Sequence, residues 1–327
     1  MQKIDLMLYL ISFLLGGVGA WSIAKWGFKL SLSDKPNLRS SHKIVTPKGG
    51  GIGILAAFFV CSIALSIPNS FWITAVFISL FSFRGDRSDI RPKVRLWFQF
   101  AAGTILLIGI LAEKGVGFTA YALIPLLLVF LVGTANFYNF MDGINGIAGI
   151  SGIVSFGLIA FYSSYSGYSA ALSTLAACIS LSCMGFIPFN MPEAKVFMGD
   201  VGSILLGFVF AGMVVYLSKN VLDFLCFMSF LFPFYIDEFT TMMVRLKYGE
   251  NLTKAHRRHL YQLLANECKI PHWKISLGYG IFQLLIGASI LSIKTMGLIT
   301  VISILVFYIC TFTTFSFIFR KKTTHFG

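Results

Sequence analysis

Charged residues are scarce in this chain, and acidic residues are the scarcest of them. Only 12% of the 327 residues are charged, with 13 Asp and Glu against 26 Lys and Arg. Because 57% of the residues are hydrophobic and the mean hydropathy is +0.81, the composition excludes an ordinary soluble domain with a large core. It is typical of an integral membrane protein.

Clustered cysteines and mixed basic–aromatic surfaces are also missing. The six cysteines are scattered, mostly inside apolar runs, with no CxxC pair and no Cys/His ligand spacing, which argues against a disulfide framework or a zinc site. The net charge of +13 would suit a nucleic-acid-binding protein, but the basic residues fall in loops between apolar runs and are not interleaved with aromatic residues. We therefore expect no nucleic acid partner.

Apolar runs repeat along the whole chain, and most are about 17–22 residues long, enough to span a bilayer as a helix. The strand alternation of an outer-membrane barrel is absent. The sequence predicts an all-α integral membrane protein, a polytopic bundle of about 10–11 transmembrane helices in one domain over residues 1–327. The predicted spans are approximately 6–27, 49–67, 70–84, 95–112, 121–138, 146–165, 169–187, 202–218, 221–241, 275–293 and 296–318. The first run lacks a basic leader and a cleavage site, so we expect it to be retained as a span.

The basic residues orient these spans. Alternate loops and the adjoining span edges hold 22 of the 26 Lys and Arg, which places that set of loops in the cytoplasm. The N-terminus is then outside and the C-terminus inside. The polar motifs all fall in the same set of loops, so we expect one site that opens to the cytoplasm. The cytoplasmic loops are predicted over residues 28–48, 85–95, 139–145, 188–201 and 242–274.

The most informative polar stretch covers residues 136–149, where two predicted spans meet. It contains Asn136, Asn139 and Asn145, three glycines and Asp142, whose charge is costly near a bilayer unless it has a role. The simpler interpretation is an interfacial turn whose polar side chains cap the next helix. Two further motifs of the same kind downstream favour a functional site.

Acidic residues from several loops suggest metal and phosphate chemistry. Carboxylates with amides suit a hard cation such as Mg²⁺, with Mn²⁺ as an alternative, and basic groups with glycine-rich turns suit phosphate. At a bilayer surface, this combination indicates a reaction between a soluble phosphate compound and a lipid phosphate. The acidic residues concerned are Asp86, Asp89, Asp142 and Asp200.

Each motif also has a structural interpretation. Asp86 and Asp89 lie among arginines and could form surface ion pairs. Asp200 could be a helix N-cap, and the glycines at 49–51 could allow close helix packing. The basic segment around His256 could bind lipid headgroups. A further acid, Asp237, ends a predicted span and should be paired or functional.

Taken together, the motifs resemble those of the bacterial polyprenyl-phosphate N-acetylhexosamine-1-phosphate transferases (glycosyltransferase family 4), which include the phospho-N-acetylmuramoyl-pentapeptide transferase. The likeness covers nearly the whole chain. The sequence of residues 136–143 looks closest to that of members that begin O-antigen or other surface-glycan synthesis. It rests on five motifs: Pro36-Asn37-x-Arg39-Ser40-x-His42 with Thr46-Pro47-Lys48-Gly49-Gly50, Asp86-Arg-x-Asp89 with Arg95, Asn136-x-x-Asn139-x-x-Asp142-Gly143, Phe197-Met-Gly199-Asp200-x-Gly202-Ser203, and His256-Arg-x-His259-Leu-x-Gln262.

The resemblance implies transfer of a sugar-1-phosphate from a UDP-N-acetylated sugar to undecaprenyl phosphate, with Mg²⁺ and release of UMP, at the cytoplasmic face of the bacterial inner membrane. It implies contact with membrane lipids and leaves the oligomeric state open, a homodimer included. By position, Asp200 and Asp142 are the implied metal ligands. The implied catalytic carboxylates are Asp86, Asp89 and Asp142. The implied substrate-binding residues are Asn37, Arg39, His42, Lys48, Asn136, Asn139, Asn190, His256, Arg257 and His259.

The chain departs from the family pattern at two positions. Gly85 stands where the family usually has the first Asp of a pair, a candidate base, and Asn145 stands where it often has Asp. These departures leave open a catalytically impaired relative that binds the lipid carrier. A membrane transporter is the other alternative, although the acids gather at one membrane face and the outer halves of the spans carry almost no charge.

Overall fold

The protein is a bundle of long helices with almost no sheet. The computed structural model describes residues 2–36, 41, 44–87, 90–251 and 256–324. In the first half of the chain, the elements are α1 (Gln2–Trp26), β1 (Ser33–Asp34), β2 (Thr46–Pro47), α2 (Ile52–Ala64), α3 (Asn69–Arg87), α4 (Pro92–Glu113), η1 (Phe118–Leu123), α5 (Ile124–Phe140) and α6 (Ile147–Tyr165). In the second half, they are α7 (Ala170–Asn190), α8 (Asp200–Leu217), α9 (Val221–Ser229), α10 (Phe232–Lys247), α11 (Leu260–Asn266), α12 (His272–Ile293), η2 (Lys294–Met296) and α13 (Leu298–Thr324).

Within the described residues, eight helices are long and apolar enough to cross a membrane. They lie at Ile4–Trp26, Pro92–Glu113, Phe118–Phe140, Ile147–Tyr165, Ala170–Asn190, Asp200–Leu217, His272–Met296 and Leu298–Lys321. The all-α class predicted from the sequence is therefore confirmed. Helices α2 and α3 occupy two more predicted spans; α2 is apolar but only 13 residues long.

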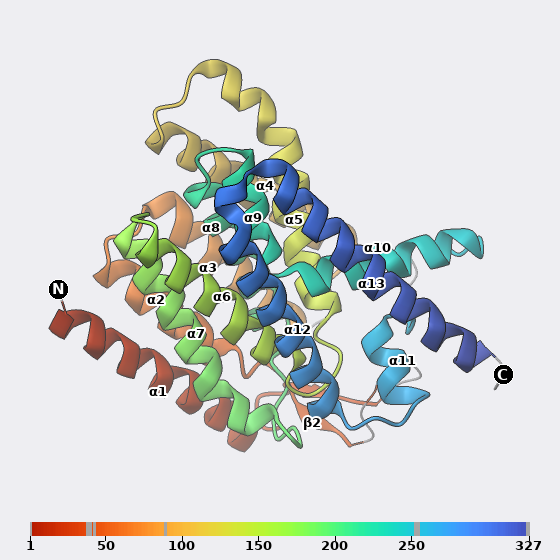
Figure 1. The fold of residues 1–327 in the computed structure, drawn as a ribbon. Coiled ribbons are helices and arrows are strands. Elements are labelled where there is room, and N and C mark those ends of the chain that lie inside the picture. The colour runs from red at the N-terminus through yellow and green to blue at the C-terminus, as the bar shows by residue number, and fades with distance from the viewer. Residues whose placement is uncertain (1, 37–40, 42–43, 88–89, 252–255, 325–327) are drawn as a thin grey trace.

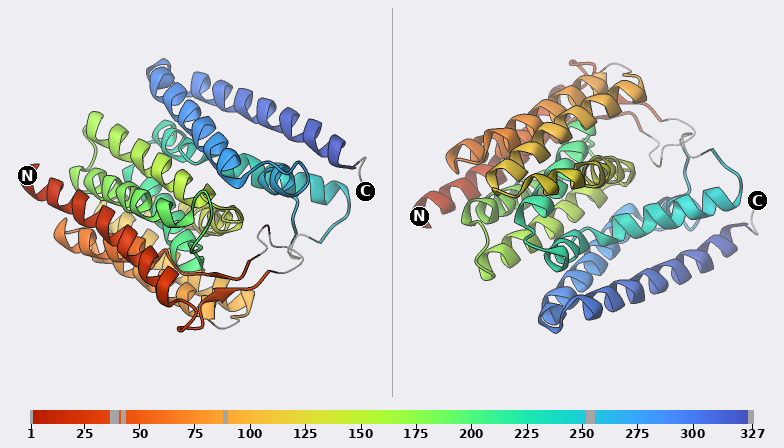
Figure 2. Two further views of the ribbon diagram at one scale, coloured as in Figure 1. Left: turned by 90° about the horizontal axis from the view of Figure 1, so that it is seen from below. Right: turned by 90° about the horizontal axis from the view of Figure 1, so that it is seen from above.

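One predicted span, at 221–241, is not a continuous helix. Helix α9 ends at Ser229 and α10 begins at Phe232, with Pro233 in its first turn. Proline has no backbone N–H and clashes with the preceding turn, which favours a break in the helix at this point. As a result α10 projects from the main bundle and runs alongside α13 (Figures 1 and 2).

Helix α8 forms the centre of the bundle. Almost every one of its side chains is buried, and its neighbours include α3 and α5. Helix α1 packs on α7 and α2 at one side of the molecule, and α13 lies on the opposite side (Figure 2). A helix buried on all sides is expected to be hydrophobic around its whole circumference.

The segment before α2 is tied to the segment before α8. Lys48 and Phe197 form a parallel bridge, and the backbone N–H groups of Gly49 and Gly50 both donate to the Phe197 carbonyl oxygen. A Cβ on Gly51 would lie 2.5 Å from the Cα of Gly202, so glycine is required for this approach. The glycine-rich entry to α2 is thus a packing motif that also carries Lys48 to the start of α8.

Candidate active site

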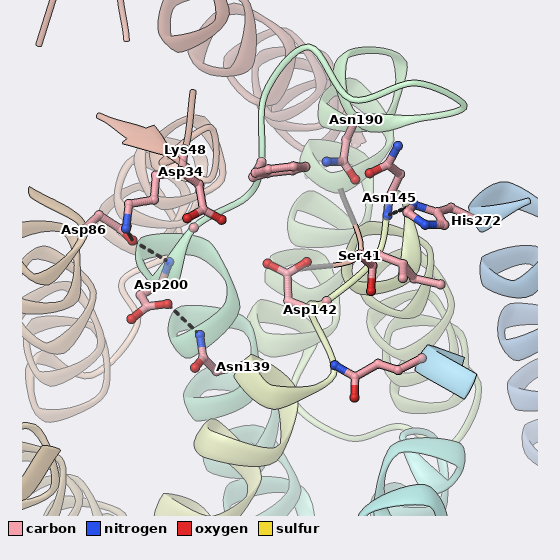
Figure 3. A pocket seen from close by; sticks show the side chains of 15 residues that line it. Asp34, Ser41, Lys48, Asp86, Asn139, Asp142, Asn145, Asn190, Asp200 and His272 are labelled. Carbon is pink, nitrogen blue, oxygen red and sulfur yellow. Dashed lines mark hydrogen bonds and ion pairs between the residues drawn. The ribbon is translucent and has the colours of Figure 1, made fainter. Parts of the chain in front are cut away.

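A cavity of about 300 Å³ opens at the end of the bundle where the polar loops gather (Figure 3). Its walls come from β1, the last turns of α3 and α7, the turn between α5 and α6, the first turn of α8, α11 and the start of α12. The lining residues are Asp34, Ser41, Lys48, Asp86, Asn139, Asp142, Gly143, Ile144, Asn145, Asn190, Phe197, Gly199, Asp200, Gln262 and His272.

Asp200 is the first residue of α8 and is held from two sides. Asn139 donates to its Oδ1 at 2.8 Å, and Arg95 donates to its Oδ2 at 2.5 Å. Asn139 also donates to the hydroxyl of Ser203 one turn further along α8. These contacts fix the carboxylate of Asp200 at the cavity wall, where the helix N-terminus favours negative charge.

Asp86 reaches the same helix start from α3. Its carboxylate accepts long hydrogen bonds from the backbone N–H groups of Asp200 (3.3 Å) and Val201 (3.4 Å), and the Lys48 ammonium lies 3.7 Å away. Burial, and next the charge of Asp200, raise the pKa of Asp86 to about 7, while Lys48 opposes the shift. Gly199, with φ +74°, leaves room for this contact, because a Cβ there would lie 2.8 Å from Oδ2 of Asp86.

Asp142 lies in the turn between α5 and α6 and points into the cavity between Asp200 and Ser41 (Figure 3). Its side chain forms no hydrogen bond or ion pair with the described residues. Burial, and then the charges of Asp200 and Asp86, raise its pKa well above the ordinary value. A carboxylate in such a place gains most from a bound cation or hydrogen-bond donor.

The amides of the site have structural partners as well as cavity contacts. Asn190 accepts from the Gly146 N–H at 2.7 Å and donates to the Val196 carbonyl at 2.9 Å, which anchors the end of α7. Asn145 donates to the Pro192 carbonyl, and its own N–H donates to Nδ1 of His272 at 3.4 Å. The turn that carries Asp142 is therefore fastened to both α7 and α12.

Most predicted site residues in the described chain meet in this cavity. Those that line it are Lys48, Asp86, Asn139, Asp142, Asn190 and Asp200. Those that do not are Asn136, whose amide donates to Gln99 inside the bundle, and His256, Arg257 and His259. The predicted residues Asn37, Arg39, His42 and Asp89 lie outside the described residues. Their roles, and the roles of the residues away from the cavity, stay predictions.

The two histidines of the predicted donor-binding motif lie beside the site rather than in it, with His259 buried and His256 half-buried. His259 lies 3.5 Å from the Glu238 carboxylate, and burial with nearby Arg320 and Arg245 lowers its pKa to about 3. Burial lowers the pKa of His256 to about 4. Both imidazoles are therefore neutral near pH 7, so neither supplies a positive charge for phosphate.

The cavity lining also includes polar residues that are absent from the predicted catalytic, substrate-binding and metal-binding set. Asp34 comes from β1, Ser41 from the loop that follows it, Asn145 from the Asp142 turn and His272 from the start of α12. The only signal for His272 was its place at the cytoplasmic end of a predicted span. Asp34 belongs to none of the sequence motifs. It reaches the cavity through the pairing of β1 with β2, which the sequence does not reveal.

The charge balance of the cavity favours a cation. Four acidic residues line it, namely Asp34, Asp86, Asp142 and Asp200. Among the described lining residues, Lys48 is the one Lys or Arg. No group of three or more His, Cys, Asp or Glu side chains in the described chain is arranged to hold a metal by itself. One or two carboxylates are nevertheless sufficient for Mg²⁺, which keeps water and substrate phosphate oxygens as its other ligands. Asp142 and Asp200 fit that requirement.

Comparisons with known proteins agree with this geometry. Residues 69–218, which include Asp86, Asp142 and Asp200, match the model of glycosyl transferase family 4. The undecaprenyl-phosphate alpha-N-acetylglucosaminyl 1-phosphate transferase of Thermotoga maritima is 25% identical over 286 residues, which cover 87% of this chain and 88% of the relative. The phospho-N-acetylmuramoyl-pentapeptide-transferase of Staphylococcus saprophyticus is 34% identical over 114 residues, about a third of each chain.

Proposed function

Because this chain belongs to glycosyl transferase family 4, we propose that it transfers an N-acetylhexosamine-1-phosphate from a UDP-activated sugar to undecaprenyl phosphate. An oxygen of the lipid phosphate attacks the β-phosphorus of the donor, the bond from that phosphorus to the bridging oxygen breaks, and UMP leaves. The observation that carries the proposal is the meeting of Asp86, Asp142 and Asp200 in one cavity at the loop end of a membrane bundle.

We propose Mg²⁺, with Mn²⁺ as the alternative, as the cofactor. The residues that would hold it are Asp142, whose side chain has no other partner among the described residues, and Asp200. When bound, the cation would neutralise charge on the diphosphate and on the departing UMP. Asp86 is less suited to direct coordination, because both its oxygens accept hydrogen bonds from the start of α8.

Other cavity residues suit the organic parts of the donor. The ammonium of Lys48 is a point charge suited to a phosphate oxygen. Phe197 presents a partly exposed ring to the cavity, which could stack on the uracil base, since every nucleobase has an apolar face. The amides of Asn139 and Asn190 already bond protein groups, so their part in binding is to hold the walls in place.

The cellular setting proposed for this chemistry follows from the charge distribution of the loops. The cavity lies at the basic, predicted cytoplasmic ends of the helices, which suits a cytosolic UDP-sugar and the inner membrane of a bacterium. We propose that the reaction is the first membrane step in synthesis of an O-antigen or another cell-surface polysaccharide. The Thermotoga maritima relative makes UDP-N-acetylglucosamine the first donor to try.

The test uses purified protein in detergent with undecaprenyl phosphate, Mg²⁺ and a panel of UDP-N-acetylated sugars. We expect metal-dependent formation of UMP and lipid-linked sugar from one donor, with at least a hundredfold loss in Asp142→Asn and Asp200→Asn. Asp223→Asn, a buried acid at the other end of the bundle, is the matched control and should keep turnover. Wild-type turnover in both cavity variants would refute the assignment. Lipid-carrier binding without turnover would instead support the impaired relative.

A further inference from the structure

Asp237 is a buried acid that lies outside the cavity and takes no part in the proposed chemistry. Asp237 on α10 has no exposed surface, and its carboxylate accepts hydrogen bonds from three donors. The Tyr279 hydroxyl donates at 2.7 Å, the Leu260 backbone N–H at 2.9 Å and the Thr241 hydroxyl at 3.2 Å. A buried carboxylate with this many donors is fully committed to its protein partners.

These donors come from different helices, so Asp237 is a junction. Leu260 begins α11, Tyr279 lies on α12, and Thr241 lies one turn further along α10. Arg320 of α13 donates to the Thr241 hydroxyl at 3.0 Å and brings a fourth helix to the same point. Because α11 has only seven residues, it is too short to be stable alone and depends on such contacts.

The other side of α11 forms part of the active-site wall. Gln262 lines the cavity, and the Tyr261 hydroxyl donates to the Phe140 carbonyl at 2.9 Å, two residues before Asp142. The turn and the helix are in close contact, because a Cβ added to Gly143 would lie 2.2 Å from the Tyr261 hydroxyl oxygen. A shift of α11 therefore moves both Gln262 and the backbone that supports Asp142.

We infer that Asp237 is a positioning residue for the active site, which it serves by fixing the start of α11 so that Tyr261 and Gln262 meet the Asp142 turn. Asp237 itself touches neither the cavity nor, on this account, any substrate. The kinetic part of the inference rests on the proposed transferase function; the structural part, the order of α11, does not. Displacement of a binding wall by about 1 Å is enough to cost about 100-fold in rate.

The test compares Asp237→Ala with Asp237→Asn, using UDP-N-acetylglucosamine turnover and amide hydrogen exchange of residues 260–266. In Asp237→Ala we expect faster exchange in α11 and at least a tenfold rise in KM for the donor, or a comparable loss of kcat/KM. Asp237→Asn keeps an oxygen that can accept from both the Leu260 N–H and the Thr241 hydroxyl, and the Tyr279 hydroxyl, which bonds the other carboxylate oxygen, can reorient to accept from the amide. It should therefore restore most of both properties.

Asp223→Ala is the matched control, because it removes a buried acid of the outer end of the bundle. Asp223 pairs with Lys294 at 2.7 Å and accepts from the Lys219 N–H. A purely stabilising role for Asp237 predicts that the two alanine variants lose thermal stability alike and leave donor KM and α11 exchange unchanged. That result would overturn the inference, and so would an asparagine variant as impaired as the alanine variant.

A second variant and a measurement that does not depend on turnover complete the test. If Asp237→Ala does not fold, Tyr279→Phe removes one of the three donors and should give a smaller change in the same direction in α11 exchange. If the wild-type protein turns over no donor, the proposed function fails, yet the exchange comparison still decides the inference. Unchanged exchange of α11 in every Asp237 and Tyr279 variant would overturn it.

Discussion

Asp86, Asp142 and Asp200 face the same cavity, but their partners differ. Asp86 caps the start of α8 and pairs with Lys48, and Asp200 is held by Arg95 and Asn139. The side chain of Asp142 has no hydrogen-bonding partner among the described residues. At the residue scale, the site therefore divides into carboxylates whose positions are fixed by the protein and one that is left for a cation or a substrate.

Gly85 stands where the related enzymes usually have an acid, and the structure suggests that the site is complete without it. Position 85 is not among the residues that line the cavity, and a Cβ there would meet only Ile90, at an ordinary 3.7 Å. We expect Gly85→Asp to fold normally, with stability within about 0.5 kcal/mol of the wild type. Turnover, measured as UMP release, should stay within about threefold, because the lipid phosphate is already ionised near neutral pH.

The matched comparison for that variant is Asp86→Asn, one residue further along α3. The amide would lose one of two acceptors for the start of α8 and the charge that attracts Lys48. The rate of UMP release should fall steeply in Asp86→Asn. If Gly85→Asp instead raised UMP release by orders of magnitude, an acid at position 85 would be the missing base and the wild-type chain would be an impaired enzyme.

Acidity should weaken metal binding. Burial and the neighbouring charges raise the pKa of Asp142, so a proton competes with a cation for this proposed ligand, and the pKa of the nearby Asp86 is raised to about 7. As the pH falls from 8 to 6, Asp86 protonates and its negative charge beside the proposed ligands is lost, so more Mg²⁺ should be needed for half-maximal turnover. Mg²⁺ titrations of UMP release at several pH values would measure this shift. A requirement for Mg²⁺ that stays constant over that range would contradict a cation site beside Asp86.

The site residues that belong to sequence motifs could be predicted from the sequence. Those that reach the cavity only through tertiary packing could not. Asp86, Asp142 and Asp200 were identifiable because acids near membrane spans are costly and their neighbours formed patterns. Asp34 and His272 carry no such pattern; they join the site through the β1–β2 pairing and the packing of α12. The buried contacts of His259 with Glu238 were equally hidden, since charge and spacing do not reveal which face of a loop turns inward.

At the scale of elements, the contact between α11 and the α5–α6 turn controls the shape of the cavity. In Gly143→Ala, the new Cβ would meet the Tyr261 hydroxyl at 2.2 Å, so one of the two segments must move. We expect a loss of about 1–3 kcal/mol in stability and a larger relative loss in turnover. Thermal unfolding and UMP release would measure the two effects.

A second substitution should relieve that clash. Tyr261→Phe removes the hydroxyl oxygen and leaves the nearest ring carbons 3.0 Å from the new Cβ. The double variant should therefore be less impaired than the sum of the single variants predicts. Gly278→Ala on α12 is the control, because a Cβ there meets nothing within 4 Å. Additive losses in the double variant would show that Tyr261 does not press on the turn.

Helix α10 shows where reasoning from hydropathy fails at the element scale. The apolar run at 221–241 continues past Ser229, so the hydropathy averaged over a window predicts one continuous span. The chain instead breaks before Pro233, and α10 turns away with Asp237 on its buried side and Phe239 exposed. Local backbone chemistry overrides average hydropathy at such a point.

At the scale of the whole molecule, the basic loops predict its orientation in the membrane. The cavity lies at the ends of the helices whose loops hold most of the Lys and Arg residues. We expect Ser166→Cys, in the α6–α7 turn, to react with an impermeant maleimide in intact cells. Lys247→Cys, at the end of α10, should react only after permeabilisation.

Both of these positions are exposed, so exposure alone cannot explain a difference between them. The control is the unsubstituted chain, in which Cys310 is exposed but lies within a predicted span. Labelling of Lys247→Cys in intact cells, with protection of Ser166→Cys, would show that the orientation in the membrane is the reverse of the one proposed. It would also place the cavity on the face that lacks UDP-sugars.

The most direct test of the whole account follows the β-phosphorus of the donor. Purified protein would be given undecaprenyl phosphate, Mg²⁺ and a UDP-N-acetylated sugar labelled at the phosphate next to the sugar. The account predicts that the label moves into the lipid fraction with the sugar, in equal amount to the UMP released, and that Asp200→Asn prevents the transfer. Label that remains in UDP, or that appears as free sugar phosphate, would contradict it.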